Sequence, residues 1–174
     1  MKRVAITGIG IVSCLGNNQD EFYNSLLNTK SGIKFSEEYK NYNFKSQICG
    51  TPDIKIEDHI DRKFIRFMGG GSAYNYIAMK EAIQDSGLEE KDVSNELTGI
   101  IMGSGGPSIK NVVHAVDSTR EAGPKKMGPF IVPRTMASTV SATLAVPFKI
   151  KGVNYSISSA CATSGHCIGN AMEL

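Results

Sequence analysis

The strongest candidate for chemistry is a cysteine surrounded by small residues. Cys161 stands in the run Ser-Ser-Ala-Cys-Ala-Thr at residues 158–163, directly after an apolar stretch. We expect the stretch to be a strand and the residues after it to begin a helix. A helix amino terminus favours negative charge and therefore a thiolate, and small neighbours leave room for a thioester. This pattern predicts a nucleophile on a strand-to-helix turn, although the residues alone leave a buried structural cysteine open.

The other cysteines give weaker signals. Cys14, Cys49 and Cys167 are expected to be buried, unreactive side chains, which is the usual setting of a free cysteine. No C-x-x-C pair is present and the chain has 3 His, so no zinc-binding spacing exists. A disulfide framework is not expected in a chain of this size with an ordinary core.

The histidines do not supply an obvious base for Cys161. His166 is five residues further along, which on one continuous helix is a rotation of about 500° and points it about 140° away. We therefore expect no catalytic role for His166. His59 lies in a polar stretch and His114 in a predicted helix, so both are expected to be surface or packing residues.

Strands and helices alternate along the chain and can position Cys161. Apolar runs predict strands at residues 4–7, 98–102 and 153–158. Helical spacing and capping residues predict helices ending at Leu27, over residues 71–86 with Gly87 as the stop, over 108–121, over 135–146 and from 160 onward. Residues 28–58 are expected to be a surface excursion with little regular structure, and Pro124, Pro129 and Pro133 to punctuate a loop.

This alternation predicts an α/β fold with a mainly parallel sheet. Functional residues in such sheets gather where strands end and helices begin. Two predicted strand ends are rich in Gly or Ser, one after Met102 and one after Ser158.

A second interpretation is a dinucleotide-binding oxidoreductase. Gly8 and Gly10 follow the first predicted strand, as in the phosphate-binding fingerprint. The third glycine would fall where Ser13 stands, and no ribose-binding acid follows a strand at the expected distance of about 20 residues. This interpretation ranks below that of a thiol nucleophile.

Composition sets the remaining limits. The chain has 174 residues, 41% hydrophobic and 21% charged, which suits one globular domain. Its net charge of +2 gives no reason to expect nucleic-acid binding. Apolar runs stop short of the ~18 residues of a membrane span, and the basic start at Met1–Arg3 leads into a strand rather than a signal peptide. We therefore expect a cytoplasmic protein without membrane insertion.

Several segments together resemble the beta-ketoacyl-acyl-carrier-protein synthases, the elongating condensing enzymes of type II fatty acid synthesis, with synthase I as the most similar subtype. The segment around Cys161, residues 152–171, is the most specific of them. Residues 3–13, Asp61 to Lys63, Arg66 to Met68, the loop at residues 103–106 and Met136 to Ser138 follow in the same order. The resemblance covers nearly the whole chain.

The resemblance implies a thiolase-like α/β/α layered fold with a mixed, mainly parallel sheet, of which residues 1–174 are the amino-terminal half. It implies a homodimer whose partner is an acyl carrier protein that delivers the phosphopantetheine, with no metal or redox cofactor of its own. Cys161 is then the acyl-accepting nucleophile, and the acyl pocket or oxyanion hole involves Gly106, Phe130 and Met136. A basic surface for the acidic carrier is expected at Arg62, Lys63, Arg66, Lys125 and Lys126.

The sequence also departs from the family pattern. The family takes two catalytic His, a Lys and a Gly-Phe-Gly segment from its second half, and none of these motifs occurs in residues 1–174. Only the backbone N–H of Cys161 can be carried over as an oxyanion donor. The chain is therefore expected to be a truncated synthase that is inactive in condensation by itself. A non-catalytic fragment that keeps carrier docking or acyl acceptance is the alternative.

Overall fold

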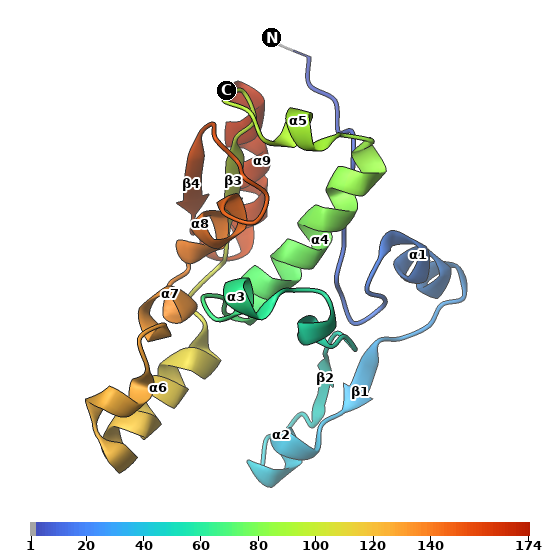
Figure 1. Cartoon of the computed structure of the whole chain (residues 1–174). Helices are drawn as coiled ribbons and strands as arrows, with labels where there is room; N and C mark the ends of the chain where they lie inside the picture. Colours follow the sequence, from blue (N-terminus) through green and yellow to red (C-terminus); the bar gives the residue numbers. More distant parts are fainter. Residues whose placement is uncertain (1–2) are drawn as a thin grey trace.

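The computed structural model describes residues 3–174. Met1 and Lys2, part of the basic start, lie outside that range. Figure 1 shows the described chain coloured along the sequence. The elements in chain order are α1 (Gln19–Leu27), β1 (Ile33–Phe35), α2 (Glu37–Asn41), β2 (Ile48–Gly50), η1 (Ile56–Asp58), α3 (Arg62–Ile65), α4 (Gly70–Ser86), α5 (Glu90–Val93), β3 (Ile100–Gly103), α6 (Ile109–Ala122), η2 (Pro124–Met127), α7 (Ile131–Thr135), α8 (Thr139–Ala145), β4 (Asn154–Ile157), η3 (Ala160–Ala162) and α9 (Thr163–Glu173).

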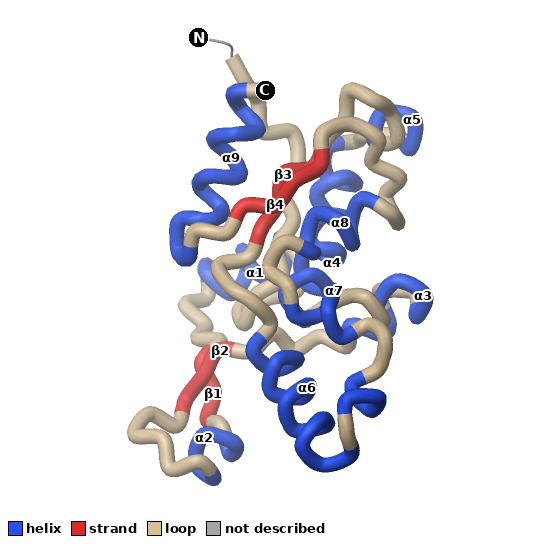
Figure 2. The backbone as a smooth tube through the Cα atoms, turned by 90° about the vertical axis from the view of Figure 1, so that its left-hand side faces the viewer, coloured by secondary structure: helices blue, strands red, loops and turns tan. Residues whose placement is uncertain are grey.

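A parallel pair of strands forms the centre of the layered part. β3 and β4 pair with Ile100 opposite Asn154 and Gly103 opposite Ile157. Helix α8 packs on one face of this pair and α9 on the other, as Figure 2 shows. This arrangement confirms the α/β/α layering. The sheet itself differs from the mixed sheet expected, because the antiparallel pair β1–β2 forms a separate sheet within the described residues.

Two buried apolar clusters hold the elements together. One centres on Ile77 of α4, and the other on Val140 and Leu144 of α8, which are 2% and 0% exposed. Tyr76 packs against both, and its ring lies 5.0 Å from that of Phe148. Helix α4 therefore links the parallel strand pair to the rest of the chain.

Helices with clear end signals agree with the sequence prediction. Gly87 ends α4 with φ 69, a left-handed conformation that glycine adopts at little steric cost. Asn18 caps α1 by accepting a 2.9 Å bond from the N–H of Glu21. Helix α6 likewise lies within one residue of its predicted range at both ends.

The strand predicted at residues 4–7 is wrong. This segment has no regular secondary structure, and Val4 and Ile6 are 61% and 80% exposed. A strand requires a partner for its ladder, and here the following N–H groups bond to α4 instead. Ile9 donates to Asp85 and Ile11 to Glu81, each over 2.9 Å. The apolar run therefore predicted a strand in a segment that has no partner strand within the described residues.

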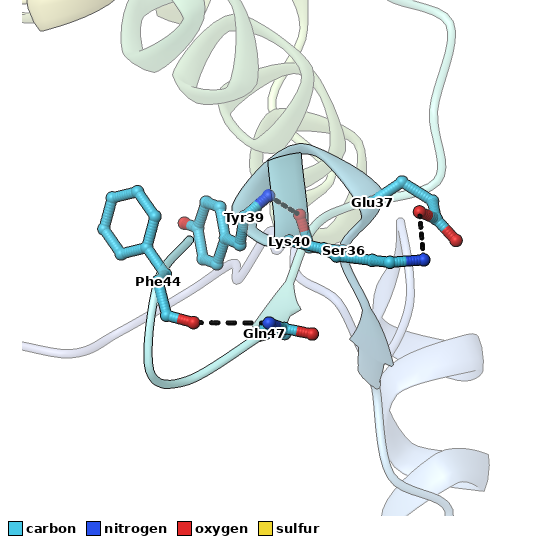
Figure 3. Close-up of polar contacts among 6 residues, drawn as sticks. All are labelled: Ser36, Glu37, Tyr39, Lys40, Phe44 and Gln47. Carbon is cyan, nitrogen blue, oxygen red and sulfur yellow. Dashed lines mark hydrogen bonds and ion pairs between the residues drawn. The ribbon is translucent and has the colours of Figure 1, made fainter. Parts of the chain in front are cut away.

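The expectation of little regular structure over residues 28–58 is also wrong. The strands β1 and β2 enclose α2, which begins where the Ser36 hydroxyl accepts a 3.2 Å bond from the N–H of Tyr39. Figure 3 shows this cap together with the Tyr39 and Phe44 rings, stacked 5.0 Å apart. Gln47 closes the loop with a 3.4 Å side-chain bond to the Phe44 carbonyl. Three-residue strands are too short to show a hydrophobic period.

Two further ranges need correction. The proline-rich loop contains η2 and α7. Pro124 fits the first turn of η2 because the N–H that proline lacks would have no partner within the helix there. The helix predicted over 135–146 begins only at Thr139. Met136 has extended backbone with ψ 134, which interrupts the helical path before α8.

Candidate active site around Cys161

Cys161 lies on a sharp turn between β4 and α9. The strand ends at Ile157, Cys161 is the middle residue of η3, and α9 begins at Thr163. Ala160, just before the cysteine, has φ 45, a left-handed conformation that is unfavourable for a residue with a Cβ. The strand-to-helix turn predicted from the sequence agrees with this backbone.

Thr163 stabilises the turn through hydrogen bonds of its side-chain hydroxyl. It is 5% exposed, and its hydroxyl accepts a 2.9 Å bond from the N–H of Ser159 and donates a 2.8 Å bond to the carbonyl of Ala160. A second bond, from the N–H of Ala162 to the Ser159 carbonyl, is 2.9 Å long. These bonds stabilise the strained conformation of Ala160 and set the position of Cys161.

The four cysteines differ in exposure. Cys161 is exposed, Cys167 is buried, and Cys14 and Cys49 are half-buried, so the burial expected for the last two is only partial. Burial raises the pKa of the Cys167 thiol above its ordinary value, against a smaller opposite effect of a backbone hydrogen bond from Ile157. Cys161 is thus the most accessible of the four thiols.

The backbone amide of Cys161 is available to a ligand. Its N–H has no acceptor among residues 3–174. An unpaired amide next to a nucleophilic sulfur is the arrangement that stabilises a developing oxyanion.

The glycine-rich loop after β3 lies against this turn. A Cβ on Gly105 would approach the carbonyl oxygen of Ala160 to 3.0 Å, and one on Gly103 would collide with the carbonyl of Ile157. Ser104 holds the loop with a 2.9 Å bond to the Gly106 carbonyl. The two strand ends rich in Gly and Ser therefore meet, because parallel strands end at the same edge of a sheet.

His166 does not pair with Cys161. Both residues are exposed, and no hydrogen bond joins them within the described residues. The rotation of about 140° assumed one continuous helix, whereas α9 begins two residues after the cysteine. His114 lies 3.5 Å from the Ser118 hydroxyl within α6, and His59 is exposed beside η1.

The three candidate pocket residues divide between two places. Gly106 and Met136 border the same cavity, of about 230 Å³. Phe130 lies elsewhere, with its ring 4.8 Å from that of Phe67 in an edge contact. Cys161 does not border the cavity that Gly106 and Met136 share.

The candidate docking cations are all exposed but differ in their partners. Lys63 forms a 3.3 Å ion pair with Asp61, and the Lys63 N–H is the main cause of the lowered pKa of Asp61. Arg66 has its guanidinium 5.7 Å from the centre of the Phe130 ring. Arg62, Lys125 and Lys126 form no ion pair within residues 3–174.

Residues 3–174 contain neither a metal-binding cluster nor a membrane-spanning helix. Those residues contain no group of three His, Cys, Asp or Glu side chains that could hold a metal ion. No helix among them combines the length and the apolar character that crossing a bilayer requires.

Comparisons with known proteins place this geometry in context. The family model described as "Beta-ketoacyl synthase, N-terminal domain" matches residues 1–174. The 3-oxoacyl-[acyl-carrier-protein] synthase 1 of Haemophilus influenzae is 52% identical over 175 residues, covering 100% of this chain and 43% of that protein. The chain therefore spans less than half the length of this relative.

Solved structures have the same fold. A beta-ketoacyl synthase from Burkholderia phymatum matches with a TM-score of 0.83 at 26% identity, over 99% of this chain and 43% of that one. A ketosynthase bound to a hexaketide and in complex with a type II polyketide synthase acyl-carrier protein matches with a TM-score of 0.77 at 18% identity, over 99% and 46%. The likeness confirms the thiolase-like architecture.

Proposed function

The chain belongs to the beta-ketoacyl synthase family, and from this membership we propose that its protein condenses an acyl thioester held on Cys161 with malonyl-carrier protein in fatty acid biosynthesis. The observation that carries the proposal is the exposed Cys161 on a turn fixed by Thr163, with its own N–H free. The protein would work in the cytoplasm without a metal or redox cofactor of its own, since the carrier brings the phosphopantetheine.

The first half-reaction uses the residues of this chain. The Cys161 thiolate attacks the acyl carbonyl, the carbonyl oxygen becomes an oxyanion facing the Cys161 N–H, and the carrier thiol leaves as the Cys161 thioester forms. Malonyl-carrier protein then loses carbon dioxide, and its carbanion attacks that thioester. The carbon–carbon bond forms, the Cys161 thiolate is released, and the product is two carbons longer.

Acyl transfer tests the nucleophile in the protein at its natural length. The Cys161→Ala variant should take up no acyl group from labelled acyl-carrier protein, whereas Cys167→Ala should be labelled like the unmodified protein. Mass spectrometry of peptides locates the thioester. Labelling that persists in Cys161→Ala would remove Cys161 from this role.

The proposed partner is an acidic acyl carrier protein that docks on Arg62, Lys63, Arg66, Lys125 and Lys126. Because Lys63 is already neutralised by Asp61, we expect Arg66 to contribute more to binding than Lys63. The Phe130 ring beneath the guanidinium also restricts Arg66 to one region of the surface. The relative solved in complex with an acyl-carrier protein supports this class of partner.

Docking is tested by charge reversal. Arg66→Glu, and Arg62→Glu combined with Lys63→Glu, should each weaken carrier binding by about tenfold or more at low salt, and the loss should shrink as salt rises. The exposed Lys45→Glu is the matched control for Arg66→Glu, because each replaces one cation with a carboxylate and Lys45 is not among the docking residues. Carrier binding that responds equally to all three variants would show long-range attraction without a docking site there.

Two further expectations belong to this proposal. Gly106 and Met136 border one cavity and are proposed to line the acyl chain path, with Phe130 at the docking surface nearby through its contact with Arg66. The protein is proposed to act as a homodimer. The alternative function, acceptance of an acyl group or a carrier without condensation, would need only the exposed Cys161 and the docking residues.

A further inference from the structure

Two neighbouring cavities open onto the amino terminus of helix α4. The smaller, of about 230 Å³, is bordered by Gly70 and Ser72, and the larger, of about 500 Å³, by Gly70 and Glu57. Lys110 and Arg134 border both. The two cavities therefore share a wall made of a helix end and two cationic side chains.

The end of the helix itself has no cap. Gly69 is the N-cap residue of this 17-residue helix, no side chain caps it, and its first turn contains no acidic residue. The N–H groups of Gly70, Gly71 and Ser72 have no acceptor among residues 3–174. Free N–H groups and the helix dipole give this end a partial positive charge, which favours an anion.

Two buried polar groups at the same wall also lack partners. Ser72 is 5% exposed, borders the smaller cavity, and forms no side-chain hydrogen bond within the described chain. The Nε atom of Arg134 is buried and unpaired as well. Buried polar atoms in proteins are nearly always hydrogen-bonded, so the unpaired Nε atom of Arg134, beside the free Ser72 hydroxyl, indicates an absent acceptor.

The charges around this wall are also unbalanced. Cations are unfavourable next to a helix amino terminus, yet Lys110 and Arg134 both stand there. Neither forms an ion pair within residues 3–174. Glu57 borders only the larger cavity, and the smaller cavity has no acidic residue in its lining.

We propose that the amino terminus of α4 binds a tetrahedral oxyanion of the phosphate class. Three amides, the Ser72 hydroxyl, the Arg134 guanidinium and the Lys110 ammonium provide more donors than a carboxylate has oxygens to fill, and they match the four oxygens and double charge of a phosphate. The anion is either free phosphate or a phosphate ester whose organic part extends into the larger cavity. This site is separate from Cys161, which borders neither cavity.

A negative charge introduced at one exposed position tests the site in the protein at its natural length. A Cβ at Gly70 would meet nothing within 4 Å, so Gly70→Asp can place a carboxylate at the helix end and Gly70→Asn an uncharged group of the same shape. Inorganic phosphate is titrated by calorimetry at constant ionic strength. Gly70→Asp should abolish phosphate binding and raise the melting temperature. Gly70→Asn should stay closer to the unmodified protein in both phosphate affinity and melting temperature.

Removal of the cations gives the second arm. Arg134→Gln should weaken phosphate binding by about tenfold or more, as expected for loss of a charged hydrogen-bond partner. Lys110→Gln, at an exposed position that tolerates change, tests the same wall if Arg134→Gln does not fold, and Lys125→Gln in η2 is the control. Glycerol 3-phosphate that binds more tightly than inorganic phosphate would indicate an ester, and the reverse order free phosphate.

Three results would overturn the proposal. These are the absence of phosphate binding to the unmodified protein, equal phosphate affinity in Gly70→Asp and Gly70→Asn, or equal loss of affinity in Lys110→Gln and the Lys125→Gln control. None of these results depends on condensing activity.

Discussion

At the scale of single residues, two cysteines six positions apart have opposite environments. Cys161 is exposed on the turn before α9, whereas Cys167 lies inside that helix, 8% exposed, against the parallel strands. The sequence predicts this difference, because Cys161 stands among small residues at an expected strand-to-helix turn, whereas Cys167 stands between His166 and Ile168. The turn that separates them depends on Thr163, whose hydroxyl bonds to backbone on both sides of Ala160.

This difference predicts the order of alkylation. Limited iodoacetamide at neutral pH should label Cys161 first and Cys167 last, because Cys167 is buried and its raised pKa keeps it protonated. Labelling of Cys167 should rise only at alkaline pH. The neutral thiol is favoured in the folded state, so its contribution to stability is present below the ordinary thiol pKa and lost as pH rises through the raised one. Peptide mapping measures the order, and faster labelling of Cys14, Cys49 or Cys167 would contradict it.

At the scale of elements, local signals predicted helices better than strands. Gly87 and the Asn18 cap are features of the chain near the helix they end, so α4 and α1 could be predicted from sequence. A strand depends on a partner far along the chain, which an apolar run does not reveal. The apolar runs at residues 98–102 and 153–158 pair with each other and were predicted correctly, whereas the run at residues 4–7 has no partner strand in the described chain and was not. Within the candidate site, the meeting of the two glycine- and serine-rich strand ends followed from the parallel order, whereas the position of Phe130 beside Arg66 did not.

The segment before α1 packs so closely on α4 that it allows no side chain at two glycines. A Cβ on Gly10 would collide with the carbonyl oxygen of Ala78, and one on Gly8 with that of Ala82. We expect Gly10→Ala to lower the free energy of unfolding by about 1–3 kcal/mol, as overpacking does. Gly169→Ala in α9, where a Cβ meets nothing within 4 Å, should instead raise it by up to about 1 kcal/mol. Urea unfolding compares them, and equal stabilities would show that the segment moves away freely.

At the scale of the whole molecule, the chain exposes an unusual amount of surface. A compact monomer of its mass, 18.8 kDa, exposes about 8,300 Å², whereas this structure exposes 11886 Å². Apolar side chains contribute to the excess, including Ile109, Val146 and Ile168 at 64%, 67% and 66% exposure. Such surface usually marks contacts with other protein.

Residues 1–174 expressed alone should therefore self-associate and should not condense. Light scattering should show a mass that rises with protein concentration, because exposed apolar faces pair with one another. Carbon dioxide release from malonyl-carrier protein should stay at background. The family's two histidines and the second oxyanion donor are not among these residues, and one missing donor alone costs about 10²–10³ in rate. Slow acyl transfer to Cys161 is still expected. A concentration-independent monomer with turnover like that of a full-length synthase would refute both expectations.

The left-handed backbone at Ala160 also limits which inherited changes this position can carry. Single-base changes of an alanine codon reach Val, Thr, Pro, Gly, Asp, Glu and Ser. Val and Thr branch at Cβ and resist positive φ, and Pro is locked at negative φ, so these alleles should be lost from a growing population. Gly and Asp adopt the conformation most readily and should persist. The backbone conformation at Ala160 thus restricts which substitutions this position tolerates, independently of the chemistry at the Cys161 sulfur.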